Sequence, residues 1–245
     1  MNEEREIEIL KTLIQQKQVS VNELAEKMYT SKASIRRDLN SLESQHLLRR
    51  VHGGAILEEN SISRIKIPFL LRELEQSDEK IQLAKYAADL VENGNVIFLD
   101  ASTSAYHIIP YLAPKKDLTV ITNGIKALTR LSEYNIRCIG TGGTVFNSCL
   151  AFVGEAACCS VEQYYADICF FSSRGLSEDG MLTDISQEEN MVRQKMIAHA
   201  KASYALFTEG KIGKQYFHRL CAAGDLTGVI TGETLRAQKD AAPDG

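Results

Sequence analysis

A run of small hydroxyl side chains follows a short apolar stretch near residue 100. The apolar segment is 96–99, and it is followed by Asp100, Ala101, Ser102, Thr103 and Ser104. Hydroxyl groups and free backbone amides at the start of a helix bind anions well. The same residue types are also common helix caps, so the pattern fits either an anion pocket or an ordinary cap.

Two further polar loops follow apolar segments in the same way. Thr122, Asn123 and Gly124 come after segment 118–121, and the loop 140–143 contains Gly142 and Gly143. Glycine lets the backbone approach a ligand closely, although it also simply forms turns. Ligands of open α/β sheets collect beyond the carboxyl ends of the strands, so the three loops together predict one ligand site.

The elements that would position these loops alternate along the chain. Short apolar runs of strand character alternate with amphipathic segments of helical spacing, which predicts an α/β domain around a largely parallel sheet. The expected strands are 96–99, 118–121, 136–139, 168–171, 204–207 and 228–231. The expected helices are 77–94 (begun by Ser77 or Asp78 and ended by Gly94), 106–112, 125–131, 155–163 and 188–200, with a frayed tail over 238–245.

The first 57 residues have a different pattern. Apolar residues recur at helical spacing over 4–15 and 21–28, and Ser31 can cap a third helix that faces inward through Ile35, Leu39 and Leu42. Segment 47–51 has strand character and Gly53 and Gly54 allow a tight turn, which predicts a winged helix-turn-helix. In this plan the second helix of the motif enters the major groove of DNA.

Positive charge is concentrated in this part of an acidic protein. The chain has a net charge of −4, yet residues 27–50 contain six basic and two acidic residues, a local charge of +4. A basic stretch of this kind also occurs on solvated helical hairpins that bind no nucleic acid. Pattern and charge alone leave both interpretations open.

Three sequence motifs of this segment resemble the DNA-binding domain of the DeoR family of bacterial regulators. They are VSVNELAEKM, SKASIRRDLNSLE and LLRRVHGGA, in order and within residues 3–57. His46 departs from the family pattern, which usually has glycine there, and we expect it to cause modest strain. The helix-turn-helix geometry and the resemblance together imply these DNA-binding residues: Ser31, Lys32, Ser34, Arg36, Arg37, Arg50 and His52.

The rest of the chain resembles the sensor domain of the same family. The matching motifs are Glu79-Lys80, Phe98-Leu99-Asp100, the serine and threonine loop 102–104, Thr119 to Asn123, Gly142-Gly143, and Lys211 with Gly213. The resemblance implies a fold similar to ribose-5-phosphate isomerase and a phosphorylated sugar as effector. It implies that Ser102, Thr103 and Ser104 hold the phosphate with Lys80 or Lys211, and that Asp100 and Asn123 bind sugar hydroxyls. The full expected effector set is Lys80, Asp100, Ser102, Thr103, Ser104, Thr122, Asn123, Gly142, Gly143, Arg174 and Lys211.

Three positions depart from the family's sensor pattern. Thr208 stands where an aspartate is typical, and Arg174 and Ser177 fall in a segment that often reads GADGID. Arg174 could bind phosphate as a planar fork or be an ordinary surface charge, and Lys80 could equally be a solvated lysine. These departures indicate an effector that differs from that of better-known members.

The predicted organisation is a DNA-binding domain over residues 3–57, a charged connector over 58–76 that contains Pro68, and a sensor domain over 77–235. We expect a non-enzymatic repressor, homo-oligomeric, that binds double-stranded operator DNA and is released by a phosphorylated sugar. The leading alternative is a DNA-binding module fused to an active sugar-phosphate isomerase. That reaction needs a carboxylate base, and the isomerase's acidic positions fall on Arg174 and Ser177, while Glu188 and Glu189 more plausibly begin a helix. A purely protein-docking module is a third possibility.

Composition excludes several other classes of protein. The longest apolar runs are far too short to cross a bilayer, and the charged N-terminus is unlike a signal peptide, so we expect a cytoplasmic protein with no membrane partner. The six cysteines include no CxxC pair and no zinc-ligand spacing, so we expect neither metal nor cofactor. The adjacent Cys158 and Cys159 leave a redox role open.

Overall fold

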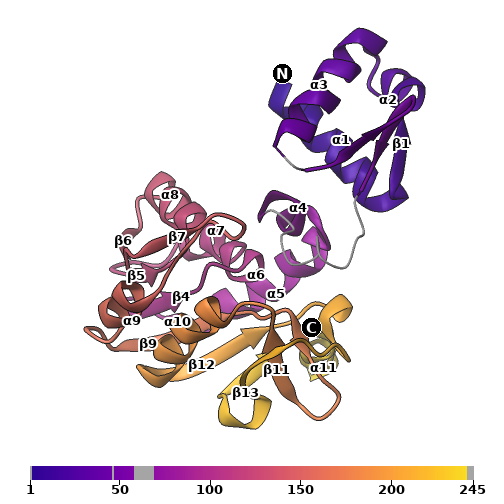
Figure 1. Cartoon of the computed structure of the whole chain (residues 1–245). Helices are drawn as coiled ribbons and strands as arrows, with labels where there is room; N and C mark the ends of the chain where they lie inside the picture. Colours follow the sequence, from indigo (N-terminus) through magenta and orange to yellow (C-terminus); the bar gives the residue numbers. More distant parts are fainter. Residues whose placement is uncertain (1, 46, 58–68, 242–245) are drawn as a thin grey trace. The chain divides into compact units, whose positions relative to one another are not determined.

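The computed structural model of the chain describes residues 2–45, 47–57 and 69–241. It divides into two compact units, residues 1–75 and residues 76–245, which are described separately below (Figure 1). The sequence interpretations of His46 and Pro68 lie outside the described residues.

The first unit contains the predicted winged helix-turn-helix. Its helices are α1 (Asn2–Gln16), α2 (Val21–Lys27) and α3 (Lys32–Ser44), and its strands are β1 (Gln18–Ser20), β2 (Arg49–Val51) and β3 (Gly54–Ile56). The strands form an antiparallel sheet in the order β1-β3-β2, in which β2 and β3 are the wing. The strand β1 was not predicted, because three residues are too few to show an alternating pattern.

Local capping explains where the helices of this unit begin. Ser20 and Glu23 form a capping box at the start of α2, and the Ser31 hydroxyl accepts a hydrogen bond from the Ser34 amide at 3.1 Å. Ile35, Leu39 and Leu42 point into the core of the unit, as the spacing predicts. The helix-turn-helix is therefore fixed by signals within its own sequence.

The predicted connector contains a helix. Residues Phe69–Leu74 form α4, and Leu71 from this helix is buried in the hydrophobic cluster of the first unit. The sequence predicted only a charged connector over 58–76, without a helix. Its apolar positions at 69–71 are sufficient to dock a short helix instead.

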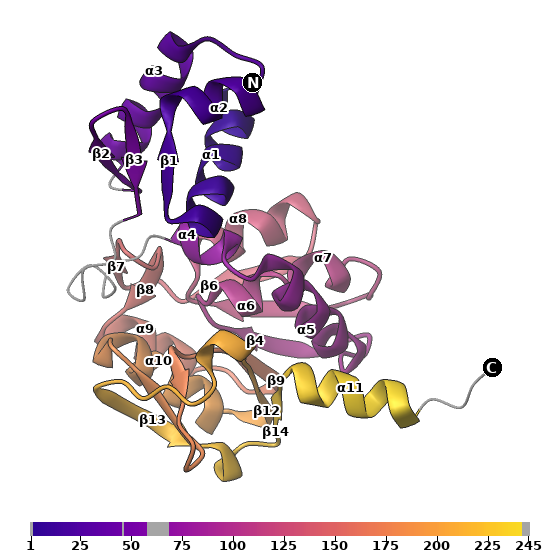
Figure 2. The same ribbon diagram turned by 90° about the vertical axis from the view of Figure 1, so that its right-hand side faces the viewer.

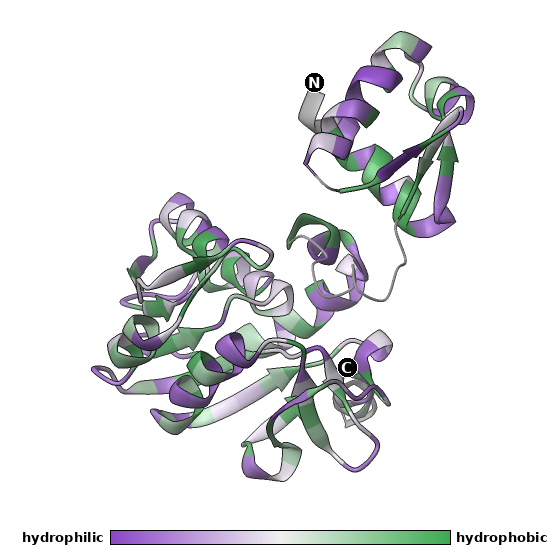
Figure 3. Cartoon of the chain, viewed as in Figure 1, coloured by the Kyte–Doolittle hydropathy of each residue, from purple (hydrophilic) through white to green (hydrophobic). Residues whose placement is uncertain are grey.

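The second unit is built on a six-stranded parallel sheet in the order β14-β12-β9-β4-β5-β6. The strands are β4 (Val96–Leu99), β5 (Thr119–Thr122), β6 (Arg137–Gly140), β9 (Ala166–Phe171), β12 (Ala200–Leu206) and β14 (Gly228–Ile230). Side chains alternate between two cores. Leu99 and Phe170 pack under α5 (Ser77–Asp89) and its neighbours, whereas Phe98 and Phe171 pack under α9 (Glu155–Val161) and α10 (Gln187–Ala198). Figure 2 shows these layers, and Figure 3 shows the apolar strands between them.

Several predicted boundaries in this unit were wrong. Helix α5 begins at Ser77, one of the two predicted starts, but it ends at Asp89 and not at Gly94. The expected helix over 106–112 is two short helices, α6 (Thr103–Tyr106) and α7 (Ile109–Leu112). Residues 238–241, expected to fray, continue α11 (Gly232–Ala241). Helix α8 (Ile125–Glu133) packs on the same side of the sheet as α5.

Smaller β-elements surround the main sheet. A hairpin is formed by β7 (Thr144–Phe146) and β8 (Ala151–Val153), and an antiparallel sheet by β10 (Gly175–Leu176), β11 (Met181–Asp184) and β13 (His218–Ala222). Single-turn helices η2 (Glu209–Lys211) and η3 (Ala223–Asp225) complete the unit. None of these short elements was predicted, because two to five residues carry little periodicity.

Candidate functional site

The polar loops singled out in the sequence lie at one edge of the main sheet. Strands β4, β5 and β6 are parallel neighbours, so the segments that follow them, beginning at Asp100, Asn123 and Thr141, share their carboxyl edge. The segments after β9 and β12, which carry Arg174 and Lys211, leave from the same edge. Ten of the eleven expected effector residues are on or beside these segments, and Lys80 is in the first turns of α5.

The hydroxyl loop after β4 is buried and internally bonded. Asp100 accepts a hydrogen bond from the Ser102 amide at 3.0 Å, and the Ser102 hydroxyl caps α6 by accepting from the Ala105 amide at 3.2 Å. Ser102 thus serves the structural role that its residue type also allowed. Ser104 is fully buried, and its hydroxyl has no hydrogen-bond partner among the described residues.

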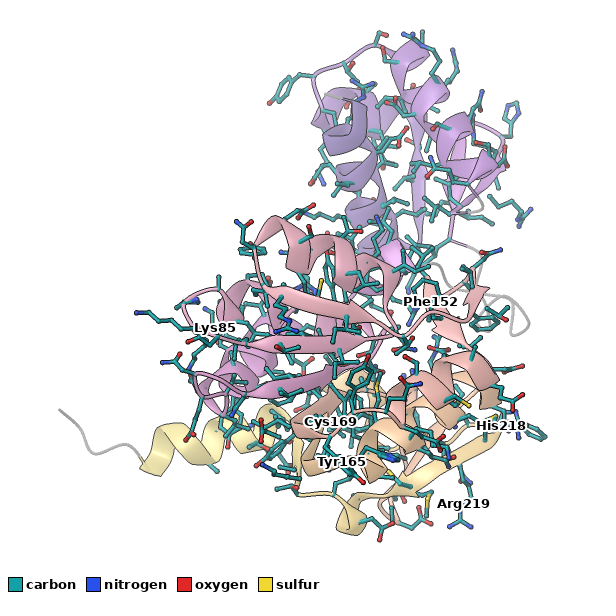
Figure 4. All side chains as sticks on the ribbon, turned by 90° about the vertical axis from the view of Figure 1, so that its left-hand side faces the viewer. Lys85, Phe152, Tyr165, Cys169, His218 and Arg219 are labelled. Carbon is teal, nitrogen blue, oxygen red and sulfur yellow. The ribbon has the colours of Figure 1, made fainter. Side chains whose placement is uncertain are left out.

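The loop after β5 has a second atom of this kind. The Asn123 side-chain amide donates to the carbonyl of Phe152 at 3.0 Å, which ties the loop to β8 (Phe152 is labelled in Figure 4). Its Oδ1 atom is buried and has no partner within the part of the chain that the structure describes. Thr122 is engaged locally, since its hydroxyl accepts from the Gly124 amide at 3.0 Å. Buried polar atoms are nearly always hydrogen-bonded, so Ser104 Oγ and Asn123 Oδ1 are the two atoms of these loops that can accept a further partner.

The glycines after β6 differ in what they allow. Both Gly142 (φ 66°) and Gly143 (φ 116°) have left-handed backbone. A Cβ on Gly143 would lie 2.7 Å from the carbonyl oxygen of Val153, so packing excludes a side chain there. At Gly142 no atom of the described residues lies within 4 Å of such a position, so its backbone is open there.

The two expected phosphate lysines, Lys80 and Lys211, lie near the carboxyl edge of the main sheet. Lys80 is buried, and the Lys211 ammonium donates to the Ser172 hydroxyl at 2.7 Å. Ser172 in turn donates to the carbonyl of Leu206 at 2.6 Å, which links the ends of β9 and β12. Arg174 is half-buried on the segment after β9.

A buried ionic cluster supports the hydroxyl loop, and the sequence did not predict it. Arg193 on α10 donates to Asp100 and Asp184 at 2.8 Å each and to Glu189 at 3.1 Å. All four side chains are at most 6% exposed. Burial alone would lower the pKa of the Arg193 guanidinium, but the three carboxylates together raise it above its usual value. Arg193 therefore remains charged and fixes Asp100.

Every carboxylate oxygen of this cluster accepts a hydrogen bond. The remaining oxygen of Asp100 is bonded to the Ser102 amide, that of Asp184 to the Ile185 amide at 2.7 Å, and that of Glu189 to the thiol of Cys149 at 3.1 Å. Glu189 therefore does more than favour the helix dipole at the start of α10. The four-residue spacing of Glu189 and Arg193 was the one signal that could have suggested an ion pair here.

Burial raises the pKa of several cysteine thiols. It raises the pKa of the Cys158 thiol, raises that of Cys221 to about 11, and raises that of Cys169 well above the usual value. Reactive cysteines have lowered pKa values, so the redox role left open for Cys158 gains no support. Among the described residues, no group of three or more His, Cys, Asp or Glu side chains is placed to hold a metal. None of the described helices is long and apolar enough to cross a bilayer.

The first unit presents a basic helix surface. The side chains of Lys32, Arg36 and Arg37 on α3 are exposed, and Ser31 and Ser34 lie at its N-terminal end. Helix α3 is held by Asp38 on its inner side, where the carboxylate accepts two hydrogen bonds from the Arg5 guanidinium on α1. A bidentate pair of this kind fixes orientation as well as distance. The cationic side chains thus project from a firmly anchored helix.

Two of the expected DNA-binding residues lie on the wing. His52 is exposed in the turn between β2 and β3. Arg50 is engaged within the protein, since its guanidinium donates to the carbonyls of Gly54 at 3.1 Å and Arg36 at 3.3 Å and to the Asn40 side chain. Arg50 therefore joins the wing to α3, a role that the sequence did not reveal.

Family models match both parts of the chain. Residues 5–61 match the DeoR-like helix-turn-helix domain, and residues 75–233 match the DeoR C-terminal sensor domain. The chain belongs to the DeoR family.

Relatives of this DeoR-family protein align over most of their length. It is 33% identical to the HTH-type transcriptional regulator FruR of Bacillus subtilis, over 87% of this chain and 84% of the relative. It is 32% identical to the lactose phosphotransferase system repressor of Staphylococcus epidermidis (95% and 93%) and 29% identical to the glycerol-3-phosphate regulon repressor of Escherichia coli (84% and 81%). A DNA-binding transcription regulator is therefore the function class of this DeoR-family chain.

Among solved structures, a ribose 5-phosphate isomerase from Methanocaldococcus jannaschii aligns with 56% of this DeoR-family chain and 55% of its own, with a TM-score of 0.43 and 19% identity.

Proposed function

We propose that this protein represses genes of sugar catabolism and leaves its operator when a phosphorylated sugar binds at the carboxyl edge of the main sheet. The observation that supports the effector site is a pair of buried atoms, Ser104 Oγ and Asn123 Oδ1, that have no hydrogen-bond partner among the described residues and follow the neighbouring strands β4 and β5. The relatives named for lactose transport and glycerol 3-phosphate support a sugar-related, phosphorylated effector.

The chemistry of the edge suits such a molecule. The Ser104 hydroxyl donates to a phosphate oxygen, the Lys80 and Lys211 ammonium groups neutralise its charge, and the open backbone at Gly142 lets the ligand approach closely. The Asn123 carbonyl oxygen accepts from a sugar hydroxyl. Thr103 and Arg174 border the phosphate, whereas Asp100, Ser102, Thr122 and Gly143 shape the loops around it.

On the DNA side, α3 enters the major groove. Ser31, Lys32 and Ser34 approach base edges and phosphates, Arg36, Arg37 and His52 contact the backbone, and Arg50 holds the wing in place. Two copies would present two such helices about 34 Å apart, one turn of DNA, so we infer a homo-oligomer acting in the cytoplasm.

An isomerase activity finds little support in this geometry. Proton transfer between adjacent carbons needs a carboxylate that can take up a proton beside the substrate. Asp100, Asp184 and Glu189 are buried, but each accepts hydrogen bonds on both oxygens and is held by Arg193. Ser177, at one of the isomerase's acidic positions, has its hydroxyl in a turn with Asp179 and Met181. We therefore propose a sensor without catalysis.

Ser104→Ala separates the ligand role of this residue from any structural role. Removing a hydroxyl without a protein partner should leave the melting temperature unchanged or slightly higher. The same change should weaken binding of the effector about 10- to 100-fold, since hydrogen bonds to charged groups are worth about 1.5–3 kcal/mol. Titration calorimetry and thermal shift with ribose 5-phosphate, fructose 1-phosphate, fructose 6-phosphate and glycerol 3-phosphate measure both effects.

The control is Ser160→Ala on α9, which should change neither quantity. A Ser104→Ala protein that binds a sugar phosphate as tightly as wild type would remove Ser104 from the site. A wild-type protein that none of the four compounds stabilises would contradict a phosphorylated effector of this size.

A further inference from the structure

Gln76 has an unusual backbone conformation at a decisive place in the chain. It is the first residue of the second unit and directly precedes α5, whose first residue is Ser77. Its φ and ψ angles of 52° and 37° are left-handed, although glutamine has no particular tolerance for this region. Residues held in sparsely populated conformations require support from their surroundings.

The support comes from the segment after β12. The Thr208 hydroxyl donates to the Gln76 side-chain carbonyl at 2.8 Å. A Cβ on Gly210 would lie 2.7 and 2.8 Å from the two polar atoms of the Gln76 amide, so this amide packs directly against the glycine backbone. The adjacent Glu209 amide donates to the Glu79 carboxylate on α5 at 2.8 Å. The departure of Thr208 from the family's aspartate thus coincides with a hydroxyl donor for Gln76.

Both expected phosphate lysines are linked to Gln76, Lys80 directly through the backbone and Lys211 through Thr208. The Lys80 amide donates to the Gln76 carbonyl at 3.1 Å, and the Lys211 amide donates to the Thr208 carbonyl at 2.9 Å. The Lys211 ammonium reaches Ser172 on the neighbouring segment. The turn that carries Lys211 therefore also contains the residue that bonds the Gln76 side chain.

We propose that Gln76 is a positioning residue that holds the Lys211 turn in place and passes a change in that turn to the chain leading to the DNA-binding unit. This inference rests on the proposed effector site. A phosphate that takes the Lys211 ammonium from Ser172 displaces Thr208, and Gln76 then loses the contacts that maintain its left-handed backbone. Rotation about φ and ψ at one residue redirects the whole preceding segment, which is how hinge residues work.

Hydrogen exchange of the full chain tests this inference. The probes are inorganic phosphate and ribose 5-phosphate, and the reference contains chloride at the same ionic strength. In wild type, either probe should protect segments 102–105 and 207–213 and should change exchange in segment 74–80 by at least about threefold. Gln76→Asn shortens the side chain while tolerating left-handed backbone, and Thr208→Val replaces the hydroxyl with a methyl group of similar size that cannot donate. Both variants should keep the protection of 207–213 and lose the response in 74–80, and the double variant should show no further effect.

Gly210→Ala provides a test in the opposite direction. The added methyl meets the Gln76 amide, so segment 74–80 should exchange faster even without a probe. Gln215→Asn, a change of an exposed glutamine, is the matched control and should behave as wild type. If wild type responds in 74–80 and Gln76→Asn and Thr208→Val respond equally, the proposed role of Gln76 is wrong while the effector site stands. If neither probe protects 102–105 and 207–213 in wild type, the effector site itself is contradicted.

Discussion

Arg193→Ala should lower the free energy of unfolding of the second unit by about 4 kcal/mol, the range measured when one partner of a buried ion pair is removed. The change leaves Asp100, Asp184 and Glu189 buried without their guanidinium. The hydroxyl loop after Asp100 should loosen at the same time.

Urea denaturation followed by circular dichroism measures this loss, and hydrogen exchange of β9 and β12 assigns it to the second unit. Arg137→Ala, which removes an exposed arginine of β6, is the matched control and should change stability by less than about 0.5 kcal/mol. If the free energy of unfolding of Arg193→Ala at neutral pH is within about 1 kcal/mol of that of wild type, the ion cluster does not stabilise the second unit as expected.

Replacing both Arg36 and Arg37 by alanine should weaken DNA binding roughly 100-fold near 100 mM salt, with about tenfold for each single change. Each side chain is exposed on α3, so the fold should be unaffected. Loss of two phosphate contacts should also reduce the slope of log affinity against log salt by about two. Fluorescence anisotropy with a duplex selected by the wild-type protein from a random pool gives both quantities.

Arg137→Ala again serves as the control and should leave affinity and slope unchanged. Unchanged binding in the double variant, with the circular dichroism spectrum of wild type, would mean that α3 does not face DNA.

Local signals made the first unit predictable. The caps at Ser20 and Ser31 and the spacing of Ile35, Leu39 and Leu42 lie within single helices, so each can be recognised without tertiary information. The alternation of apolar strands with amphipathic helices, which predicts the parallel sheet, can likewise be read from neighbouring residues alone. The edge on which the effector loops meet follows from topology, because parallel strands bring all their carboxyl ends to one side.

What could not be predicted depends on contacts between distant segments. The Arg193 cluster joins Asp100, directly after β4, to residues of β11 and α10. No sequence pattern predicts that Asp100 and Arg193 meet across 93 positions. Arg50 was predicted only as a DNA-binding residue, and its hydrogen bonds to α3 and β3 could not be read from the sequence. Likewise, nothing about glutamine marks residue 76 as left-handed. Its conformation becomes intelligible only when Thr208 and Gly210 are seen beside it.

The most direct test of the account is the titration of the selected duplex with wild-type protein, in the presence and absence of each of the four sugar phosphates. Binding at the sheet edge and binding to DNA are coupled in this account, so at least one compound should lower the affinity for the duplex by about 5- to 150-fold. The duplex should lower the affinity for that compound by the same factor, since coupling between two binding equilibria is reciprocal. A compound that binds the protein and is weakened by Ser104→Ala, yet leaves duplex affinity unchanged, would contradict effector-controlled release from DNA.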